Sequence, residues 1–180
     1  DNVPVLRFNS LSFQRSVAVR LQSSLYLERD YVAVYGDPCD CVNFLLSGTV
    51  GVVNSEGSIT HSLETGSFFG EQGILATWDH ILRVHGESHD LQRSFSKDDQ
   101  KRTRRLRVPA GFDLCQEKYT FSVRTLSPFC EAYFLRYKDV LELFQLFPAF
   151  ANSLRVAGKL RTATASANAR ISKAAHEAKV

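Results

Sequence analysis

The chain has 180 residues, a length typical of a single domain with some additional sequence. Its hydrophobic fraction of 44% and its 13 Phe predict a packed globular core. The net charge of +3 is too small to indicate a nucleic-acid-binding protein.

The four cysteines indicate reduced thiols in a cytoplasmic protein. Cys39, Cys41, Cys115 and Cys130 form neither a disulfide framework nor the paired spacing of a zinc site. We therefore expect no metal and no cofactor. No apolar run approaches the ~20 residues of a membrane span, and no signal peptide opens the chain. Because the chain begins at Asp1 and contains no Met, we expect it to be part of a longer protein.

The first predicted element is an amphipathic helix over residues 12–24. Phe13, Val17 and Leu21 recur at helical spacing, and Ser12 is a suitable N-cap. From residue 25 to 63 the pattern changes to short runs rich in Val, Leu, Tyr and Phe. Turn sequences separate these runs at 36–38, 47–48, 54–57 and 65–66, which predicts an antiparallel sandwich or barrel.

Residues 65–71, Thr-Gly-Ser-Phe-Phe-Gly-Glu, are the most informative motif of the chain. Gly66 and Gly70 allow the backbone to approach a ligand closely, and a short helix predicted over 72–76 would offer unpaired N–H groups to an anion. The carboxylate of Glu71 could accept hydrogen bonds from sugar hydroxyls. Two structural alternatives remain open, because such turns also form barrel corners and an acidic residue also caps a helix.

Residues 77–117 lack strand character and are mostly polar, with a strongly charged run at 97–107. Because loops beyond ~15 residues are uncommon inside compact domains, we interpret this stretch as an insertion, mobile or disordered in whole or in part. Strand character returns at 119–124 and 130–135. His85 and His89 have the four-residue offset of a metal pair on a helix, but we favour a solvated loop there.

Two helices are predicted for the last third of the chain. Val140, Leu141, Phe144 and Phe147 share the apolar face of the first helix, which ends before Pro148. The second helix has an apolar stripe that includes Phe150, Leu154 and Ala157 and leads into an Ala-rich, charged tail over 162–180.

The ordered set of motifs resembles the cyclic nucleotide-binding domain, and more closely its cation-channel type. The segments that carry the resemblance are 3–6, 44–50, 66–71, 120–124 and 143–148, together with Gly36. The resemblance implies an eight-stranded antiparallel β-roll, mainly β, with an N-terminal helix and two C-terminal helices. It also implies that residues 66–71 begin the phosphate-binding cassette between strands six and seven.

The resemblance implies a role for several residues of this cassette. Gly70 would let the backbone approach the ligand, Glu71 would bind the ribose 2′-hydroxyl, and amides of the next short helix would face the cyclic phosphate. Thr120 matches a position whose hydroxyl contacts the phosphate or purine, and Arg161 matches an arginine of a lid helix that closes over the purine. The predicted ligand-binding residues are Phe69, Gly70, Glu71, Gly73, Ile74, Tyr119, Thr120 and Arg161.

One position departs from the family pattern. The family places an arginine directly before the threonine to pair with the phosphate, and this chain has Tyr119 there. Loss of a charge-assisted hydrogen bond worth about 1.5–3 kcal/mol should weaken a cyclic nucleotide about ten- to a hundredfold. Either Lys118 or Arg107 replaces the missing cation, or the site has abandoned cyclic phosphates. We favour the second explanation, because Glu71 would still serve the ribose of a nucleoside. Arg124 is too far along the strand for this role, and a solvated or salt-bridged position is expected for it.

The sequence therefore predicts a regulatory sensor domain rather than an enzyme, since the strand segments contain only His61 as a potential metal-binding histidine. The expected ligands are cAMP, cGMP or a purine nucleoside, and no nucleic acid. The expected organisation is a roll with a hinge helix over 1–148, containing the 77–117 insertion, and a lid helix with a tail over 149–180. The resemblance also implies a larger, possibly tetrameric channel and a position at the cytosolic face of a membrane. The alternative is a domain that has lost its ligand and acts as an interaction module.

Overall fold

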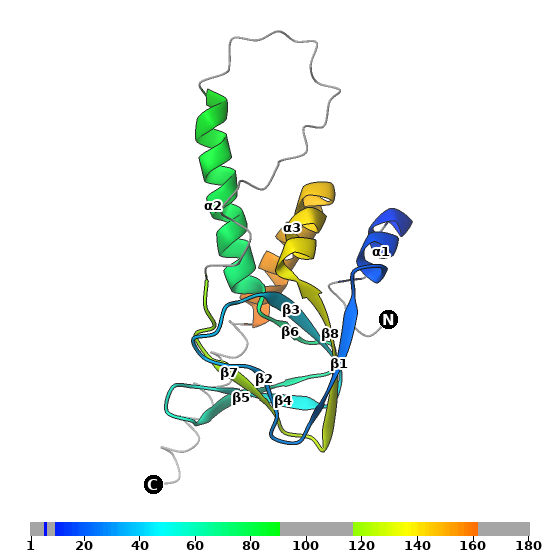
Figure 1. Cartoon of the computed structure of the whole chain (residues 1–180), viewed down its shortest axis with the longest axis vertical. Helices are drawn as coiled ribbons and strands as arrows, with labels where there is room; N and C mark the ends of the chain where they lie inside the picture. The colour runs from blue at the N-terminus through cyan, green and yellow to red at the C-terminus, as the bar shows by residue number, and fades with distance from the viewer. Residues whose placement is uncertain (1–5, 7–9, 91–116, 162–180) are drawn as a thin grey trace.

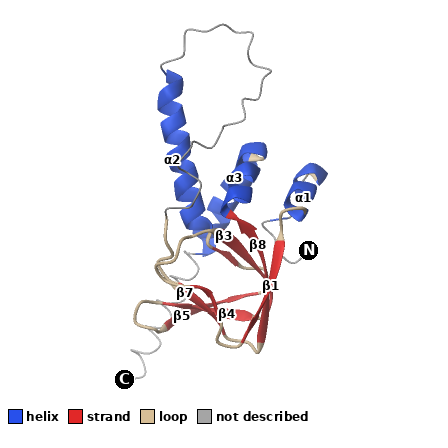
Figure 2. Cartoon of the chain, viewed as in Figure 1, coloured by secondary structure: helices blue, strands red, loops and turns tan. Residues whose placement is uncertain are grey.

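Two four-stranded antiparallel sheets form the centre of the molecule (Figure 1 and Figure 2). The computed structural model describes residues 6, 10–90 and 117–161, with only the backbone for 85–90. The strand orders are β1-β8-β3-β6 in one sheet and β2-β7-β4-β5 in the other. The strands are β1 Gln22–Leu27, β2 Tyr31–Ala33, β3 Cys41–Ser47, β4 Thr49–Val53, β5 Ile59–Glu64, β6 Phe68–Phe69, β7 Ser122–Thr125 and β8 Phe129–Arg136.

The turns lie where the sequence predicts them. Gly48 joins β3 to β4 at a φ of 87°, and a Cβ there would lie 2.6 Å from the carbonyl oxygen of Phe129. Between β4 and β5, the side-chain oxygen of Asn54 accepts hydrogen bonds from the amides of Glu56 and Ser58. The turn at Gly48 connects the two sheets, whereas the turn at Asn54 closes the β4–β5 hairpin and fixes its register, and with it which residues reach the interior.

The N-terminal helix α1 spans Leu11–Ala18 and is shorter than predicted. Its N-cap is Ser10, whose hydroxyl accepts from the amide of Phe13 at 3.1 Å, so the prediction of Ser12 as N-cap was wrong. Residues 22–24, predicted as helix, belong to β1. Phe13 and Val17 are the buried positions of α1, as their spacing indicates.

Helix α2 spans Glu71–Asp90 and is far longer than the short helix expected after the glycine motif. The interpretation of residues 77–90 as an irregular insertion was therefore wrong. Ile74, Trp78 and Ile81 lie on one side of this helix and are buried, which explains why it continues past the cassette. Its C-terminal half projects away from the sheets (Figure 1). The rest of the predicted insertion, 91–116, lies outside the described residues.

The two helices predicted after β8 are confirmed. Helix α3 spans Tyr137–Leu146 and buries Val140, Leu141 and Phe144. Residues 148–161 form a second helix, called the C-terminal helix below, which starts at Pro148. Proline suits a first helical position because its missing N–H would have no intrahelical partner there. The predicted tail, 162–180, lies outside the described residues. The eight strands and the flanking helices confirm the predicted fold class.

A cluster of aromatic rings connects the helices. Phe13 of α1 packs against Phe150 of the C-terminal helix with ring centroids 5.1 Å apart, and Phe150 packs against Phe144 of α3 at 5.6 Å. Phe144 also contacts Trp78 of α2 at 5.6 Å. Such pairs each add about 0.5–1.5 kcal/mol beyond the burial of apolar area. The cluster thus fixes the start of the C-terminal helix against α1, α2 and α3.

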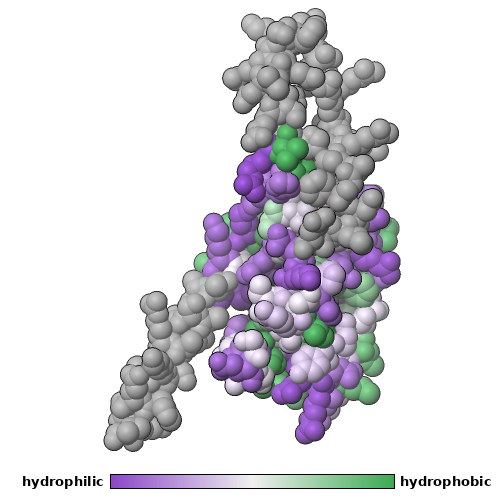
Figure 3. Space-filling model, turned by 60° about the vertical axis from the view of Figure 1, so that its left-hand side comes forward, coloured by the Kyte–Doolittle hydropathy of each residue, from purple (hydrophilic) through white to green (hydrophobic). Residues whose placement is uncertain are grey.

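The surface of the described residues is mixed in polarity. On the face drawn in Figure 3, hydrophobic residues occur mostly as separate spots among hydrophilic ones. Exposed apolar residues scattered in this way are normal for a folded domain and do not by themselves indicate a partner.

Candidate functional site

The candidate site begins at the turn from β6 into α2. Gly70 occupies this turn with a φ of 89°, a value that residues with a side chain rarely adopt. A Cβ at this position would lie 2.4 Å from the carbonyl oxygen of Cys41 and 3.1 Å from the hydroxyl of Tyr119. Only glycine allows the chain to turn here, and the turn places Glu71 in the first turn of α2.

Glu71 is almost completely buried, with 1% of its surface exposed. One carboxylate oxygen, Oε1, lies 2.5 Å from Nη2 of Arg161 on the C-terminal helix. Burial raises the pKa of Glu71 above its ordinary value, an effect that Arg161 and the backbone amide of Glu71 partly oppose. The other oxygen, Oε2, is buried and has no hydrogen-bond partner. Because an unpaired buried acceptor is costly, this oxygen is suited to a donor from a ligand.

Arg161 is held at this position by three contacts. Besides the ion pair with Glu71, its guanidinium donates to the carbonyl oxygen of Phe68 and lies 4.8 Å from the centroid of the Phe68 ring. Cation–π contacts of this kind are favourable when the cation is partly desolvated. The C-terminal helix is therefore bonded directly to the strand and to the helix that form the cassette.

The C-terminal helix approaches Glu71 closely because residue 158 is a glycine. A Cβ at Gly158 would lie 2.8 Å from Oε1 of Glu71. Gly158 is buried, as is Leu154 one turn before it. Leu154, Gly158 and Arg161 follow at helical spacing, so one stripe of this helix faces the cassette.

Tyr119, in the place of the family's arginine, is buried beside Gly70 with 6% of its surface exposed. Its hydroxyl donates to the carbonyl oxygen of Cys41 at 3.3 Å and lies 3.9 Å from the Cys41 sulfur. Burial is the largest cause that raises the pKa of Tyr119, and it also raises the pKa of Cys41 to about 11. Both groups are therefore uncharged at neutral pH, and neither replaces a cation.

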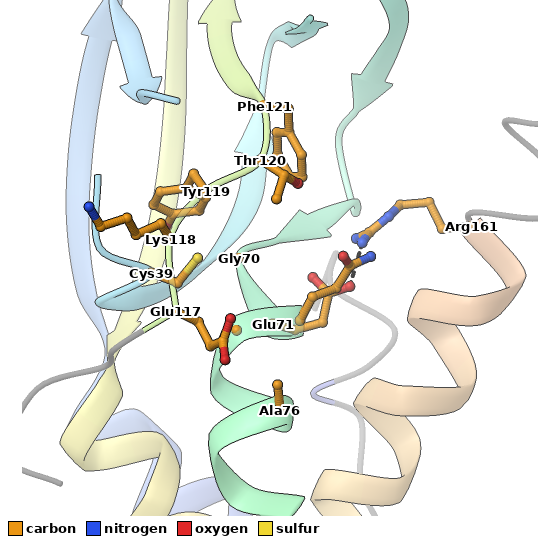
Figure 4. A pocket seen from close by; sticks show the side chains of 12 residues that line it. Cys39, Gly70, Glu71, Ala76, Glu117, Lys118, Tyr119, Thr120, Phe121 and Arg161 are labelled. Carbon is orange, nitrogen blue, oxygen red and sulfur yellow. Dashed lines mark hydrogen bonds and ion pairs between the residues drawn. The ribbon is translucent and has the colours of Figure 1, made fainter. Parts of the chain in front are cut away.

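These residues surround a pocket of about 210 Å³ between the start of α2, residues 117–121 and Arg161 (Figure 4). Ligand pockets commonly have volumes of about 300–1,000 Å³, so the pocket is small for a nucleotide in this position of Arg161. Figure 4 shows Arg161 and Glu71 turned toward each other, with the side chain of Lys118 directed away from that pair. The pocket is lined by Cys39, Gly70, Glu71, Gln72, Gly73, Ala76, Glu117, Lys118, Tyr119, Thr120, Phe121 and Arg161.

The structure brings six of the eight predicted ligand-binding residues to this pocket: Gly70, Glu71, Gly73, Tyr119, Thr120 and Arg161. Phe69 and Ile74 are not among its lining residues, since their side chains are buried in the core with 1% and 0% exposure. For all eight residues, contact with a ligand stays a prediction.

Of the two candidates for a replacement cation, Lys118 lines the pocket and Arg107 lies outside the described residues. Arg124 does not line the pocket, and its buried Nε has no hydrogen-bond partner.

Sequence reasoning missed several residues around the pocket. His61 on β5 is near enough to Arg161 that this charge lowers the pKa of His61, although burial lowers it more. Gly158 was also missed, although a glycine within the helical stripe that contains Leu154 and Arg161 was a usable signal. The lining residues that were not predicted as ligand contacts are Cys39, Gln72, Ala76, Glu117, Lys118 and Phe121.

Gly73 has a structural role that competes with ligand binding. A Cβ at Gly73 would lie 2.7 Å from the Cβ of Cys39 and 2.9 Å from the Cβ of Glu117. The glycine lets the first turn of α2 pack directly on the loop before β3 and on the chain that returns at residue 117.

Among the described residues, no group of three or more His, Cys, Asp or Glu side chains is arranged to hold a metal ion. His85 and His89 belong to helix α2 rather than to a loop, and only their backbone is described. In the same part of the chain, no helix is long and apolar enough to cross a membrane.

The architecture defines a β-roll with a cassette helix and a C-terminal helix bonded to it. Residues 25–89, from β1 into α2, match the family model of the cyclic nucleotide-binding domain. This match and the fold confirm the resemblance to a cyclic nucleotide-binding domain that the sequence indicates. No curated protein matches the chain significantly.

Two solved structures have the same fold. The C-linker/CNBHD of zELK channels, crystallised in the presence of cAMP, is 14% identical with a TM-score of 0.56, over 89% of this chain and 61% of that one. The regulatory domain of Toxoplasma gondii PKA with cAMP is also 14% identical with a TM-score of 0.58, over 87% of this chain and 46% of that one. This chain thus spans about half to three-fifths of the length of these relatives.

Proposed function

We propose that this chain is a regulatory domain that binds a cyclic nucleotide or a related purine nucleoside in the pocket at the start of α2. Occupancy would be transmitted through the C-terminal helices. The family match and the pocket at the cassette support the ligand class. We propose no catalytic role.

The bond between Glu71 and Arg161 is the observation that carries this proposal. Glu71 belongs to the cassette helix and Arg161 to the C-terminal helix. A nucleotide that binds near Glu71 has to enlarge a pocket of about 210 Å³ that Arg161 helps to line. We propose a second position of the C-terminal helix, in which Arg161 has left Glu71. A ligand that binds this second position more tightly shifts the equilibrium towards it.

We propose an organisation in two parts. Residues 1–148 form the roll together with α3 as a hinge helix, and residues 149–180 form a lid. It would form part of a longer chain, possibly a tetrameric channel with this domain at the cytosolic face of the membrane. The shared fold with a channel domain and with a kinase regulatory domain supports a regulatory role within a larger chain.

Calorimetric titration of the purified chain with cAMP, cGMP, adenosine and guanosine tests ligand binding. Saturable binding of any one of them supports the proposal, and no heat of binding from all four at millimolar concentration refutes it. Hydrogen exchange tests the transmission step, since protection of amides in residues 148–161 must change when the ligand binds.

A second function is favoured by a specific observation. Glu71 is already paired with Arg161 of the same chain, and Tyr119 supplies no positive charge for a phosphate. These two features favour a domain without a ligand that acts as an interaction module. The variant Glu71→Ala separates the two hypotheses. It weakens nucleotide or nucleoside binding if the pocket is a ligand site, and it has no binding to weaken if the pocket is closed permanently.

A further inference from the structure

The Oε2 atom of Glu71 is the least satisfied polar group at the pocket. Its residue is 1% exposed, and the atom has no hydrogen-bond partner although Oε1 is paired with Arg161. A carboxylate oxygen only accepts hydrogen bonds, so a ligand that satisfies Oε2 must bring a donor. Another acceptor next to it, such as a phosphate oxygen, would be repelled.

The charges around the pocket do not favour an anion. Two carboxylates, Glu71 and Glu117, and two cations, Lys118 and Arg161, are among the lining residues. Arg161 is already paired with Glu71. Lys118 is exposed, and Figure 4 shows its side chain directed away from Glu71 and Arg161. No cation among the described lining residues is therefore both unpaired and directed at the cassette.

The corner beside Gly70 is occupied by an uncharged group. The hydroxyl of Tyr119 lies 3.1 Å from the position of a Cβ at Gly70, directly before the first turn of α2, and it donates to the carbonyl oxygen of Cys41. The N-terminus of α2 would by itself attract an anion, but the carboxylate of Glu71 already lies in this first turn. This carboxylate lessens the attraction that the helix N-terminus would otherwise offer to a phosphate.

From these contacts we propose that the ligand is an uncharged nucleoside, bound through a ribose hydroxyl that donates to Oε2 of Glu71, and that its cyclic phosphate binds more weakly. The inference rests on the proposed function and narrows its ligand class. The missing arginine does not weaken such a ligand, because a nucleoside carries no charge for it to neutralise.

The test compares each nucleoside with its own 3′,5′-cyclic phosphate by calorimetry on the full 180-residue chain. Adenosine or guanosine is expected to bind about tenfold or more tightly than the matching cyclic phosphate. The 2′-deoxynucleoside is expected to bind about ten- to a hundredfold more weakly than the nucleoside, because the donor to Glu71 is lost. Glu71→Ala, which removes both acceptor oxygens, should remove most of this difference between the ribose and deoxyribose forms.

Two results overturn the inference. A cyclic phosphate that binds as tightly as its nucleoside would leave the proposed function intact and refute the uncharged ligand. Equal binding of the ribose and deoxyribose forms would refute the contact with Glu71. If no compound binds, the proposed function fails together with the inference.

The variant Tyr119→Arg provides a gain-of-function control. An arginine beside Gly70 places a cation at the start of α2, so affinity for the cyclic phosphate should rise about tenfold or more relative to that for the nucleoside. Circular dichroism reports whether the buried arginine is tolerated, and the comparison of ligands on the unmodified chain does not depend on it. A cyclic-phosphate affinity that stays constant in folded Tyr119→Arg contradicts the inference.

Discussion

Gly158→Ala tests whether the C-terminal helix is packed on the cassette carboxylate as described. In an ordinary helix this change stabilises by about 1 kcal/mol, because alanine has the higher helix propensity. Here the new Cβ would lie 2.8 Å from Oε1 of Glu71, closer than Cβ contacts normally come. Glu71 can withdraw only by weakening its bond to Arg161, and overpacking of this kind costs about 1–3 kcal/mol. We therefore expect the variant to be between neutral and about 2 kcal/mol less stable.

A double-mutant cycle with Glu71→Ala isolates this contact. Without the glutamate side chain the clash disappears, so Gly158→Ala should then stabilise by about 1 kcal/mol. The coupling energy between the two sites is accordingly expected to be about 1–3 kcal/mol, measured as the free energy of unfolding in urea by circular dichroism. If Gly158→Ala stabilises both backgrounds equally, the C-terminal helix does not pack on Glu71 and the proposed coupling loses its structural basis.

Three further predictions concern the turn, the pH dependence and the helix packing. Gly70→Ala should destabilise by about 2 kcal/mol more than Gly57→Ala in urea unfolding, because both glycines have a positive φ but only at Gly70 would the Cβ meet a carbonyl oxygen; equal effects would contradict the described turn. The neutral form of His61 is favoured in the folded state, since burial and a nearby cation lower its pKa from 6.5. The contribution of His61 to stability is present above pH 6.5 and is lost as the pH falls through the lowered pKa. The urea midpoint of the unmodified chain should therefore fall more on acidification than that of the His61→Gln variant. Parallel pH profiles of the two proteins would refute this. Trp78→Ala should cost about 3–5 kcal/mol because the indole is buried and packs on Phe144, whereas Trp78→Phe should keep at least half of that stability, and a loss below about 1 kcal/mol would contradict the packing of α2.

The strands could be predicted because turn residues and apolar runs are local signals. The turn after β3 contains Gly48, whose backbone has a positive φ, and the turn after β4 contains Asn54, whose side chain accepts hydrogen bonds within the turn. Helix boundaries were harder. Ser10 and Ser12 are both plausible N-caps in sequence, and only the contact of Ser10 with the amide of Phe13 decides between them.

The length of α2 was the main error of the sequence-based prediction. Ile74, Trp78 and Ile81 follow at helical spacing, but three apolar positions among polar neighbours are a weak signal. What stabilises them is the packing of Trp78 on Phe144, more than sixty residues later, which no local pattern contains. Tertiary contacts therefore decide the secondary structure here.

At the candidate site, the glycine turn and the carboxylate could be predicted, whereas the pairing could not. Glu71 and Arg161 are 90 positions apart, and their contact depends on how the C-terminal helix crosses the start of α2. The absence of a cation at residue 119 was visible in the sequence, but the destination of the tyrosine was not. Its hydroxyl donates to the carbonyl of Cys41, a group that every residue possesses and that carries no sequence signature.

The order of strands in the two sheets has a consequence for how this chain folds. In each sheet a late strand is inserted between two early ones, with β8 between β1 and β3 and β7 between β2 and β4. The strands before residue 90 thus leave β1 and β2 without partners within their own sheets. The second sheet can close only after β7 has been synthesised through Thr125, and the first only after β8 has been synthesised through Arg136. A nascent or truncated chain that stops within α2 would therefore expose unpaired strand edges. Completion of both sheets therefore depends on pairing between strands that precede α2 and strands that follow residue 121.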